Sequence, residues 1–531
     1  MQRTGLTFLT ALAASVALLP WAAMAQQSPA SVTVQADQRG PKIDRDIFGQ
    51  FAEHLGTGIY GGVWVGKNSS IPNVRGIRTD VVEALRAIKV PNVRWPGGCF
   101  ADEYHWRDGI GDPKKRPVTV NANWGGSIEN NAFGTHEYFD FIDQIGSEAY
   151  VSINLGSGTY QEAAEWVAYM TADTRNTAGQ MRAANGRKEP WKIRYLGIGN
   201  ENWGCGGSMR AETYVDELKR FSRFSRNYNP AQQGTDNPQA MRRVAVGPDD
   251  KDTRYTEAVM KAWKERDWAW NIEGLSLHSY TVIKFPAAYD SVNFGEKEYA
   301  EILQSTLRMN DLIEMHGAIM DRYDPEKKVP LIVDEWGTWY AKLPDSPEGY
   351  LQQQNSLRDA MVAALNFNIF ARHADRVRGA NIAQMVNVLQ AMILTDKDRM
   401  VLTPTYHIHK MYLPFQDATL VPTSLDAGTY RFGEISMPQL DAVAVRDMAG
   451  KLWLSLVNVD PNRSMPVRVR LAGVTPGTAK GQQLTAGAVN AINSFDAPDM
   501  VTPRQVSAQI ENGAVAIELP AKSVTMLLIE P

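Results

Sequence analysis

The sequence predicts an α/β protein, a (β/α)8 barrel of the TIM type followed by a C-terminal antiparallel β-sandwich. Two observations lead to this fold class. Between residues 46 and 413, short runs rich in valine, isoleucine and leucine recur, and amphipathic stretches separate most of them. After about residue 415 the pattern changes to short alternating runs separated by glycine, proline and asparagine. The first pattern is typical of buried parallel strands, and the second is typical of antiparallel strands with one exposed face.

The first 25 residues are predicted to form a signal peptide that is not part of the fold. Arg3 precedes a long apolar stretch, and Ala23-Met24-Ala25 fits the small-residue cleavage rule. The mature chain would then begin near Gln26. Because the apolar stretch is too short for a comfortable membrane span, we expect an exported protein that is either periplasmic or secreted.

Residues 26–45 are expected to belong with the far end of the chain. Ser31–Asp37 reads SVTVQAD, an alternating strand pattern that has no partner in the predicted barrel. We therefore expect this segment to join the β-sandwich, which is predicted to occupy residues 414–531. The barrel is predicted to occupy residues 46–413.

Eight runs make up the predicted barrel, and each has a polar residue at or near its C-terminal end. In order they read IDRDIFGQF, VPNVRWPGG, AYVSINLG, IRYLGIGNE, RRVAVGPDD, IEGLSLHSY, VPLIVDEWG and RGANIAQMVN. Stretches such as HEYFDFIDQIG and AETYVDELKRFSRFS have helical periodicity and lie between them. A doubly wound open sheet is the competing fold, but no glycine-rich phosphate loop follows the first run. In a barrel the carboxyl ends of the strands converge on one face, so these polar residues should meet there.

Composition excludes several classes of function. The chain has 531 residues and a formal net charge of −4, with acidic and basic residues mixed along it. No basic stripe predicts a nucleic-acid partner, and no polybasic cluster predicts a membrane partner. The 14 tryptophans and 19 tyrosines are a generous supply of rings that could stack on sugars, although most of them should be core residues. With two cysteines, a disulfide framework or a cysteine-rich metal site is excluded, while a single disulfide remains possible.

Two glutamates are the candidate catalytic residues. Glu201 ends the fourth run in the context IGNE, and Glu335 ends the seventh in the context VDE. A glycosidase needs two carboxyl groups flanking the scissile bond, one to protonate the leaving oxygen and one to attack the sugar or activate water. The alternative is that both glutamates form structural ion pairs at strand ends. The other polar strand ends favour the catalytic interpretation.

Five motifs together resemble glycoside hydrolase family 51, the retaining α-L-arabinofuranosidases. They are RWPGGCFADEYHWRDGIG, GIGNENWGCGG, LHSY, DEWGTWY and NIAQMVNV, and the resemblance runs from Gly49 to about Leu413 with a matching C-terminal β-sandwich. It implies an exo-acting enzyme that removes terminal arabinofuranosyl residues from arabinan, from the hemicellulose arabinoxylan or from their oligosaccharides. Members of the family are often oligomeric, so a homo-oligomer is an expectation from the resemblance alone.

The resemblance also implies roles for individual residues. Glu201 would be the general acid and base, Glu335 the nucleophile, and Asn200 a hydrogen-bond partner of the sugar 2-hydroxyl. Arg94 would keep Glu335 ionised. The remaining residues would bind substrate or wall the pocket: Glu53, His278, Tyr280, Gln384 and Trp203. Three of these roles have alternatives. Arg94 could form a core salt bridge, Gln384 could be a satisfied buried amide, and His278 could have a structural role.

Cys99 departs from the pattern of some family members, which have asparagine there as a sugar contact. A thiol is a poor hydrogen-bond partner, so the contact at this position is in doubt. Cys205 lies just after the predicted acid and base. We expect Cys99 and Cys205 to form a disulfide across two mouth loops, and two buried free thiols are the alternative.

Two other functions remain open from the sequence. The family also contains endo-β-1,4-glucanases and members that accept xylosides, and loop lengths alone do not separate them from exo-enzymes. A non-catalytic carbohydrate-binding protein on a decayed barrel is the second alternative. The predicted mechanism needs no metal or other cofactor.

Overall fold

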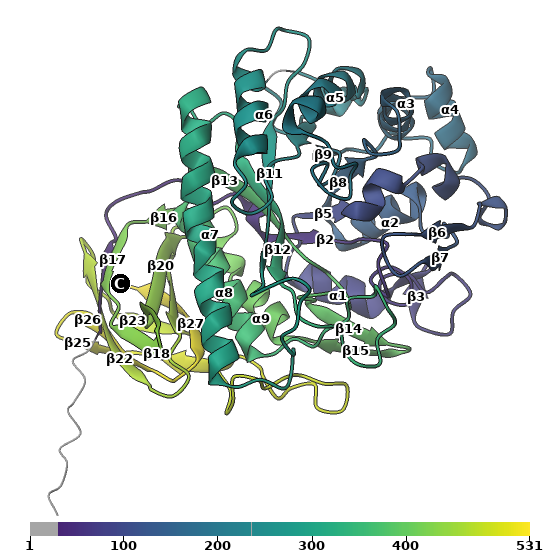
Figure 1. The fold of residues 1–531 in the computed structure, drawn as a ribbon. Coiled ribbons are helices and arrows are strands. Elements are labelled where there is room, and N and C mark those ends of the chain that lie inside the picture. The colour runs from purple at the N-terminus through teal and green to yellow at the C-terminus, as the bar shows by residue number, and fades with distance from the viewer. Residues whose placement is uncertain (1–29, 235) are drawn as a thin grey trace, which may run out of the picture.

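The computed structural model describes residues 30–234 and 236–531 (Figure 1). The predicted signal peptide, residues 1–25, lies outside the described residues. A barrel surrounded by helices packs against a smaller, all-β part that contains both the first described strand and the end of the chain (Figure 1).

Eight parallel strands close into a barrel in the order β10-β11-β12-β13-β2-β5-β8-β9. Their bounds are β2 (Gly49–Phe51), β5 (Asn92–Trp95), β8 (Glu148–Ile153), β9 (Tyr195–Ile198), β10 (Arg242–Ala245), β11 (Gly274–Thr281), β12 (Leu331–Thr338) and β13 (Val377–Ile382). Each strand overlaps one of the eight predicted runs to within one residue, and the prediction of a (β/α)8 barrel is confirmed. Tyr150, Tyr195, Val244 and Ile332 pack together inside it.

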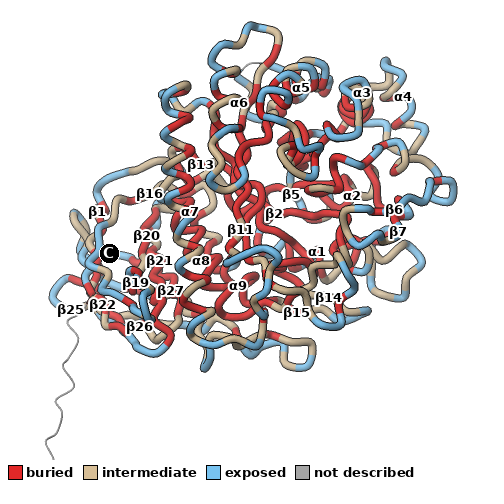
Figure 2. Tube along the Cα trace, viewed as in Figure 1, coloured by how far each residue is buried: buried red, intermediate tan, exposed pale blue. Residues whose placement is uncertain are grey.

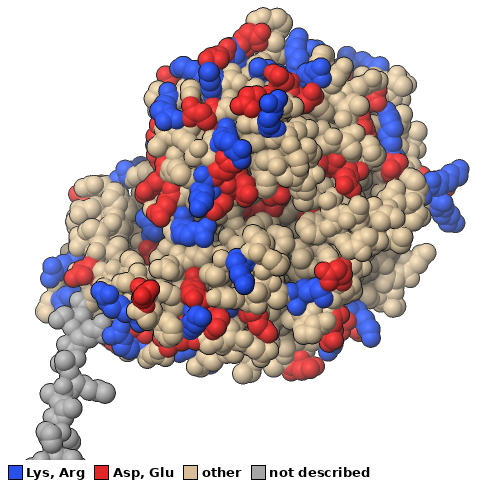
Figure 3. Space-filling model, viewed as in Figure 1, with Lys and Arg blue, Asp and Glu red and all other residues tan. Residues whose placement is uncertain are grey.

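Helices surround the barrel (Figure 1). They are α1 (Thr79–Ala87), α2 (Thr135–Ile145), α3 (Tyr160–Thr171), α4 (Thr177–Ala184), α5 (Ala211–Phe224), α6 (Arg254–Lys264), α7 (Glu296–Tyr323), α8 (Leu357–Arg372) and α9 (Pro404–Met411). In the described part of the chain, no helix combines the length and the hydropathy that crossing a bilayer requires. Lysines, arginines and acidic residues are interspersed over the face seen in Figure 3, as expected from the small net charge.

Three of the loops of the barrel contain a small β-hairpin. They pair β3 (Asn73–Val74) with β4 (Ile77–Arg78), β6 (Thr119–Asn121) with β7 (Ser127–Glu129), and β14 (Ile393–Asp396) with β15 (Arg399–Leu402). The β6–β7 hairpin lies in the long connection between β5 and α2. It carries Trp124 to the barrel mouth, as described below.

The β-sandwich consists of two sheets, in the orders β17-β1-β22-β26-β25 and β16-β20-β21-β27-β23-β24. Its strands are β1 (Ala30–Gln35), β16 (Thr419–Val421), β17 (Thr423–Asp426), β20 (Leu440–Arg446), β21 (Leu452–Asn458), β22 (Met465–Ala472), β23 (Thr478–Leu484), β24 (Arg504–Ser507), β25 (Gln509–Glu511), β26 (Ala514–Leu519) and β27 (Ser523–Glu530), while β18 (Thr429–Phe432) and β19 (Ile435–Pro438) form a separate hairpin. β1 pairs antiparallel with β17 and parallel with β22. Apart from that parallel pair the ladders of the sandwich are antiparallel, as predicted.

Helix α8 is buried on all sides because it lies between the barrel and the sandwich. Every residue of α8 except Arg372 is buried (Figure 2). It contacts α7 and α9 on one side and β20, β21 and β27 on the other. Its sequence, LRDAMVAALNFNIFAR, is apolar around most of its circumference, as expected for a helix without a solvent-facing side.

A long segment of the sandwich, residues 485–503, reaches across to the barrel loops. The N–H of Leu357, at the start of α8, donates to the carbonyl of Ala491 at 2.9 Å. The side-chain amide of Asn490 donates to the carbonyl of Val292, in the loop after β11, at 3.0 Å. The sandwich therefore supports loops that belong to the barrel.

Replacing Val32 in β1 with aspartate should destabilise the protein by several kcal/mol, because the carboxylate would be buried without a partner. Val32 is fully buried between the two sheets, whereas Ser31 next to it is exposed. Thermal unfolding followed by near-UV circular dichroism would measure the change, with Ser31→Asp as the control. Equal melting temperatures for the two variants would show that β1 contributes little to the sandwich.

Candidate active site

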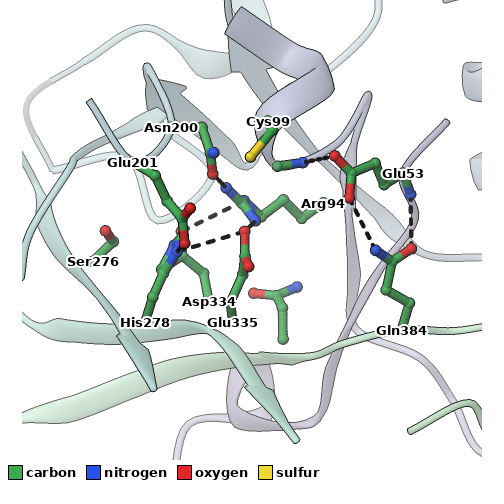
Figure 4. A network of polar contacts seen from close by, with 12 residues as sticks. Glu53, Arg94, Cys99, Asn200, Glu201, Ser276, His278, Asp334, Glu335 and Gln384 are labelled. Atoms are coloured by element: carbon green, nitrogen blue, oxygen red, sulfur yellow. Dashed lines mark hydrogen bonds and ion pairs between the residues drawn. The ribbon is translucent and has the colours of Figure 1, made fainter. Parts of the chain in front are cut away.

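Glu201 and Glu335 lie at the same end of the barrel, with His278 between them (Figure 4). Glu201 follows β9, Glu335 lies in β12 and His278 in the neighbouring β11. One carboxylate oxygen from each glutamate and one ring nitrogen of His278 all lie within 4.8 Å of one another. The two predicted carboxyl groups therefore face a common point.

Two hydrogen-bond donors and the closely packed backbone at Gly98 fix the position of the Glu335 side chain. Arg94 Nη1 donates to its Oε1 at 2.7 Å, and the hydroxyl of Tyr280 donates to its Oε2 at 2.7 Å. A Cβ atom at Gly98 would lie 2.9 Å from Oε1, so only glycine leaves room for the carboxylate there. The Glu335 side chain is thereby fixed and 5% exposed.

Arg94 connects three acidic or amide side chains from inside the barrel. Besides Glu335, it donates through Nη2 to Asn200 Oδ1 at 2.5 Å and places Nε 3.6 Å from Asp334 Oδ2. Burial acts to lower the pKa of Arg94, but the charges of Asp334 and Glu335 raise it above its ordinary value. A guanidinium ion therefore stays charged beneath the site and balances two carboxylates.

His278 bridges Glu201 and Asp334. Its Nδ1 lies 2.7 Å from Glu201 Oε1, and its Nε2 lies 3.2 Å from Asp334 Oδ1. Burial acts to lower its pKa, but the charges of Glu335 and Asp334 and the hydrogen bonds to Asp334 and Glu201 raise it to about 10. At neutral pH the ring is therefore an imidazolium that donates to Glu201 and forms an ion pair with Asp334.

The two acidic neighbours of His278 have pKa values shifted in opposite directions. Burial and the charge of Glu335 raise the pKa of Glu201, and His278 partly offsets the rise. Burial acts to raise the pKa of Asp334, but the charges of Arg94 and His278 together lower it below its ordinary value. Such a separation is what a site with one acid and several permanent carboxylates requires.

Glu53 forms a second cluster on the opposite side of the pocket. Its Oε1 accepts hydrogen bonds from the N–H groups of Gly98 and Phe100 and from Trp124 Nε1, all at 3.0–3.1 Å. Its Oε2 accepts from Gln384 Nε2 at 3.0 Å. Burial and the charge of Glu335 raise the pKa of Glu53 to about 7.

A pocket of about 80 Å³ lies between these clusters. Its walls are Glu53, Leu55, Gly98, Cys99, Trp124, Glu201, Tyr280, Glu335, Trp339, Leu351, Gln384 and Leu389. Arg94, Asn200 and His278 instead line a smaller cavity beneath it, together with Asp334. Trp203 is partly buried against the hydrophobic core and is not among the residues that line either cavity. A wider groove on the outer surface, between α5, α6 and α7, contains neither catalytic candidate.

Cys99 and Cys205 are joined by a disulfide with a Cα–Cα distance of 5.6 Å. Cys99 begins the short 3₁₀ helix η2 (Cys99–Glu103), which follows β5, and Cys205 lies in the loop after β9. Cys205 Sγ lies 3.6 Å from Glu201 Oε2 and 3.7 Å from Asn200 Nδ2. The bridge thus connects two mouth loops beside Glu201.

Sequence reasoning missed several pocket residues, chiefly Trp124 and Trp339. Trp124 is the tip residue of a hairpin whose strands are too short to give a pattern. Trp339 lies in DEWGTWY, a motif noted for its acidic residues, and its ring packs edge-on against Tyr280 with centroids 5.0 Å apart. Leu351 and Leu389 come from loops without any strand or helix signal.

Two groups in the described chain have metal-ligand spacing, but neither suits a metal ion. One is Glu201, His278 and Glu335, and the other is Cys99, Glu201 and Cys205. Both ring nitrogens of His278 already face carboxylate oxygens, Nδ1 that of Glu201 at 2.7 Å and Nε2 that of Asp334 at 3.2 Å. The two cysteine sulfurs are already bonded to each other.

Two carboxyl groups that face each other at the carboxyl end of a (β/α)8 barrel define a glycoside hydrolase site. The comparisons with known proteins agree with this class. Residues 84–242 match the "Alpha-L-arabinofuranosidase 1 domain" model, and residues 334–523 match the "Alpha-L-arabinofuranosidase C-terminal domain" model. An intracellular exo-α-L-arabinofuranosidase from Bacteroides ovatus is 45% identical over 98% of each chain.

Solved structures extend the comparison. The family 51 arabinofuranosidase from Xanthomonas axonopodis pv. citri is 50% identical, with a TM-score of 0.91 over 94% of this chain and 100% of that one. The α-L-arabinofuranosidase from Thermotoga petrophila is 29% identical, with a TM-score of 0.79 over the same shares. The chain therefore belongs to the α-L-arabinofuranosidases of glycoside hydrolase family 51.

The prediction that the protein is exported is wrong by the same comparison. The Bacteroides ovatus relative, aligned over 98% of each chain, is named an intracellular enzyme. A basic residue, an apolar stretch and small residues form only a compositional signal. That signal does not establish a periplasmic or secreted location here.

Replacing His278 with glutamine should shift the alkaline limb of the kcat/KM profile to higher pH. The imidazolium lowers the pKa of Glu201, so its removal lets burial and Glu335 raise that pKa further. The pH dependence of arabinofuranoside hydrolysis by the wild type and the variant would test this. An alkaline limb that stays in place or moves to lower pH would show that His278 does not control the ionisation of Glu201.

Proposed function

We propose that the protein is an exo-acting, retaining α-L-arabinofuranosidase that removes terminal arabinofuranosyl residues from arabinan, arabinoxylan or their oligosaccharides. The observation that supports this most directly is the separation of the carboxyl groups, whose nearest oxygens lie within 4.8 Å in a family 51 barrel. Retaining glycosidases hold the two groups about 5 Å apart, whereas inverting enzymes need about 6.5–9.5 Å for an intervening water.

In the first step, Glu335 attacks C1 of the arabinofuranose and the C1–O bond to the aglycone breaks. Glu201 gives its proton to the departing oxygen, so the aglycone leaves as an alcohol. The raised pKa of Glu201 favours the protonated form that this step needs. Arg94 and Tyr280 hold the two oxygens of Glu335, which orients the nucleophile.

In the second step, water hydrolyses the glycosyl ester. Once Glu335 is esterified, its negative charge no longer raises the pKa of Glu201. Glu201 therefore becomes a better base and takes a proton from the water that attacks C1. Glu335 leaves as a carboxylate, and the arabinose has the anomeric configuration of the substrate.

The other polar residues have roles in binding the sugar or in positioning the two carboxyl groups. Asn200 lines the smaller cavity beneath the pocket, and its Nδ2 has only a weak sulfur contact at 3.7 Å; the contact with the sugar 2-hydroxyl is proposed from the family resemblance. Glu53, together with Gln384 beside it, would accept and donate hydrogen bonds to the remaining hydroxyls. His278 lies beneath the pocket and would position Glu201 without contacting the sugar. Trp124 and Trp339 supply ring faces at the pocket wall. A homo-oligomeric state stays a prediction.

Wild-type protein should hydrolyse 4-nitrophenyl α-L-arabinofuranoside, with 4-nitrophenyl β-D-xylopyranoside and carboxymethyl cellulose as poorer substrates. Glu335→Ala should abolish turnover because no nucleophile remains. Glu201→Ala should lower kcat by about 10²–10⁴-fold, and azide should restore it by replacing the activated water. Proton NMR of the first product should show the α-anomer.

Other outcomes would point elsewhere. Activity on cellulose alone would indicate an endo-glucanase, and activity on the xyloside alone would indicate a xylosidase. The β-anomer as first product would indicate inversion. No activity on any of the three substrates would favour a carbohydrate-binding protein.

A further inference from the structure

Asp102 is a buried carboxyl group that lies outside the sugar pocket and belongs to η2. It is 2% exposed. Its Oδ1 accepts hydrogen bonds from the N–H groups of Leu155 at 2.7 Å and Gly156 at 2.9 Å. Its Oδ2 accepts from the N–H of Asn200 at 2.8 Å and from the side-chain amide of Asn202 at 3.1 Å. In the described part of the chain no cationic side chain forms an ion pair with it. Burial raises the pKa of Asp102 to about 7, and these four hydrogen bonds, which favour the carboxylate, offset only part of the rise.

The hydrogen bonds to Oδ2 come from the residues on either side of Glu201. Glu201 has a φ of +40°, in the left-handed region that residues other than glycine seldom adopt. Its carbonyl accepts from the N–H groups of Gly204 at 2.7 Å and Gly206 at 3.1 Å. The backbone at Glu201 therefore turns sharply, and Asp102 holds it on both sides of the turn.

Gly206 closes the same loop directly onto Asp102. A Cβ atom at Gly206 would lie 2.3 Å from Asp102 Oδ2 and 2.0 Å from the carbonyl of Asn200. Close contact at this point requires glycine. The disulfide from Cys99 to Cys205 attaches the far part of the loop to η2, while Asp102 attaches the part that carries Glu201.

We propose that Asp102 is a positioning residue for Glu201. Its carboxylate holds the loop after β9 in the conformation that points the Glu201 carboxyl at the leaving-group oxygen. Four donors converge on it, and an ionised carboxylate is the side chain that only accepts. An asparagine would turn an NH₂ group toward two of those donors. The inference rests on the proposed function, in which Glu201 is the acid.

Leaving-group dependence tests the proposal, because protonation by Glu201 matters most for poor leaving groups. A 4-nitrophenolate departs without a proton, whereas the alcohol of an arabino-oligosaccharide does not. Asp102→Asn should therefore lower kcat/KM for an unactivated arabino-oligosaccharide by about 100-fold. On 4-nitrophenyl α-L-arabinofuranoside, kcat/KM should fall several-fold at most. Azide should raise kcat for the aryl substrate, as it does when Glu201 is removed.

Asp46→Asn is the matched control. Asp46 is also fully buried, but it accepts hydrogen bonds from Arg194, Tyr195 and Asn92, none of which belongs to the loop between β9 and α5 that carries Glu201. This control should change both kcat/KM values by the same factor. If Asp102→Asn does not fold, Asn202→Ala is the second variant. It removes one donor to Asp102 Oδ2 and the hydrogen bond from the same amide to the Gly206 carbonyl, and it should lower kcat/KM for the oligosaccharide relative to the aryl substrate by a smaller factor.

An equal loss on both substrates for Asp102→Asn, or for Asn202→Ala, would overturn the positioning role. Failure of the proposed function has a different signature. In that case the wild type would hydrolyse neither 4-nitrophenyl α-L-arabinofuranoside nor the arabino-oligosaccharide. Retained activity in Glu335→Ala would also contradict the proposed function.

Discussion

The active site depends on balancing several buried negative charges with two positive ones. The carboxyl groups are those of Glu53, Glu201, Asp334 and Glu335, and the cations are Arg94 and His278. Carboxylates this close together repel one another in a poorly hydrated interior, so some must be protonated or paired. Arg94 and His278 lie beneath the pocket and pair with the acids from below. The upper surface of the carboxyl groups is thereby left open for a neutral sugar.

The barrel makes this balance possible because it brings distant strands together. Arg94 comes from β5, His278 from β11 and Glu335 from β12, yet all three side chains interact directly. Their charges also explain why the pKa shifts have opposite signs in one site. Glu201 contacts only one of the cations, His278, and its pKa is raised, while Asp334 contacts both cations and its pKa is lowered.

Much of this could be predicted from the sequence, for a definite reason. Buried parallel strands are continuous apolar runs in the sequence, and the residue at the carboxyl end of each strand must lie at the mouth of the barrel. Glu201, Glu335 and Glu53 could therefore be found as strand-end acids. Trp124 could not, because its place depends on a hairpin inside a long loop and not on any periodic pattern.

Residues that act from below the pocket were harder to assign. His278 ends a strand just as a sugar-binding residue would, and only the structure shows that its ring turns toward Glu201 and Asp334. Trp203 follows Asn202 in a motif rich in functional residues, but it packs against the core. Asp102 lies in a motif that the family resemblance includes, and its contacts to the backbone leave no sequence signal. Position along a motif does not predict which way a side chain points.

The pairing of β1 inside the sandwich has a consequence for how the chain assembles. Val32 faces Val469 in the parallel ladder with β22, so the barrel is an insertion between strands of one sheet. During synthesis β1 has no strand to pair with until β17, which follows the whole barrel, has been made. Contacts so far apart in sequence form slowly. Apart from the closing pair β13 and β2, each barrel strand pairs with the next one along the chain, so most of the barrel can assemble before β1 finds its partners.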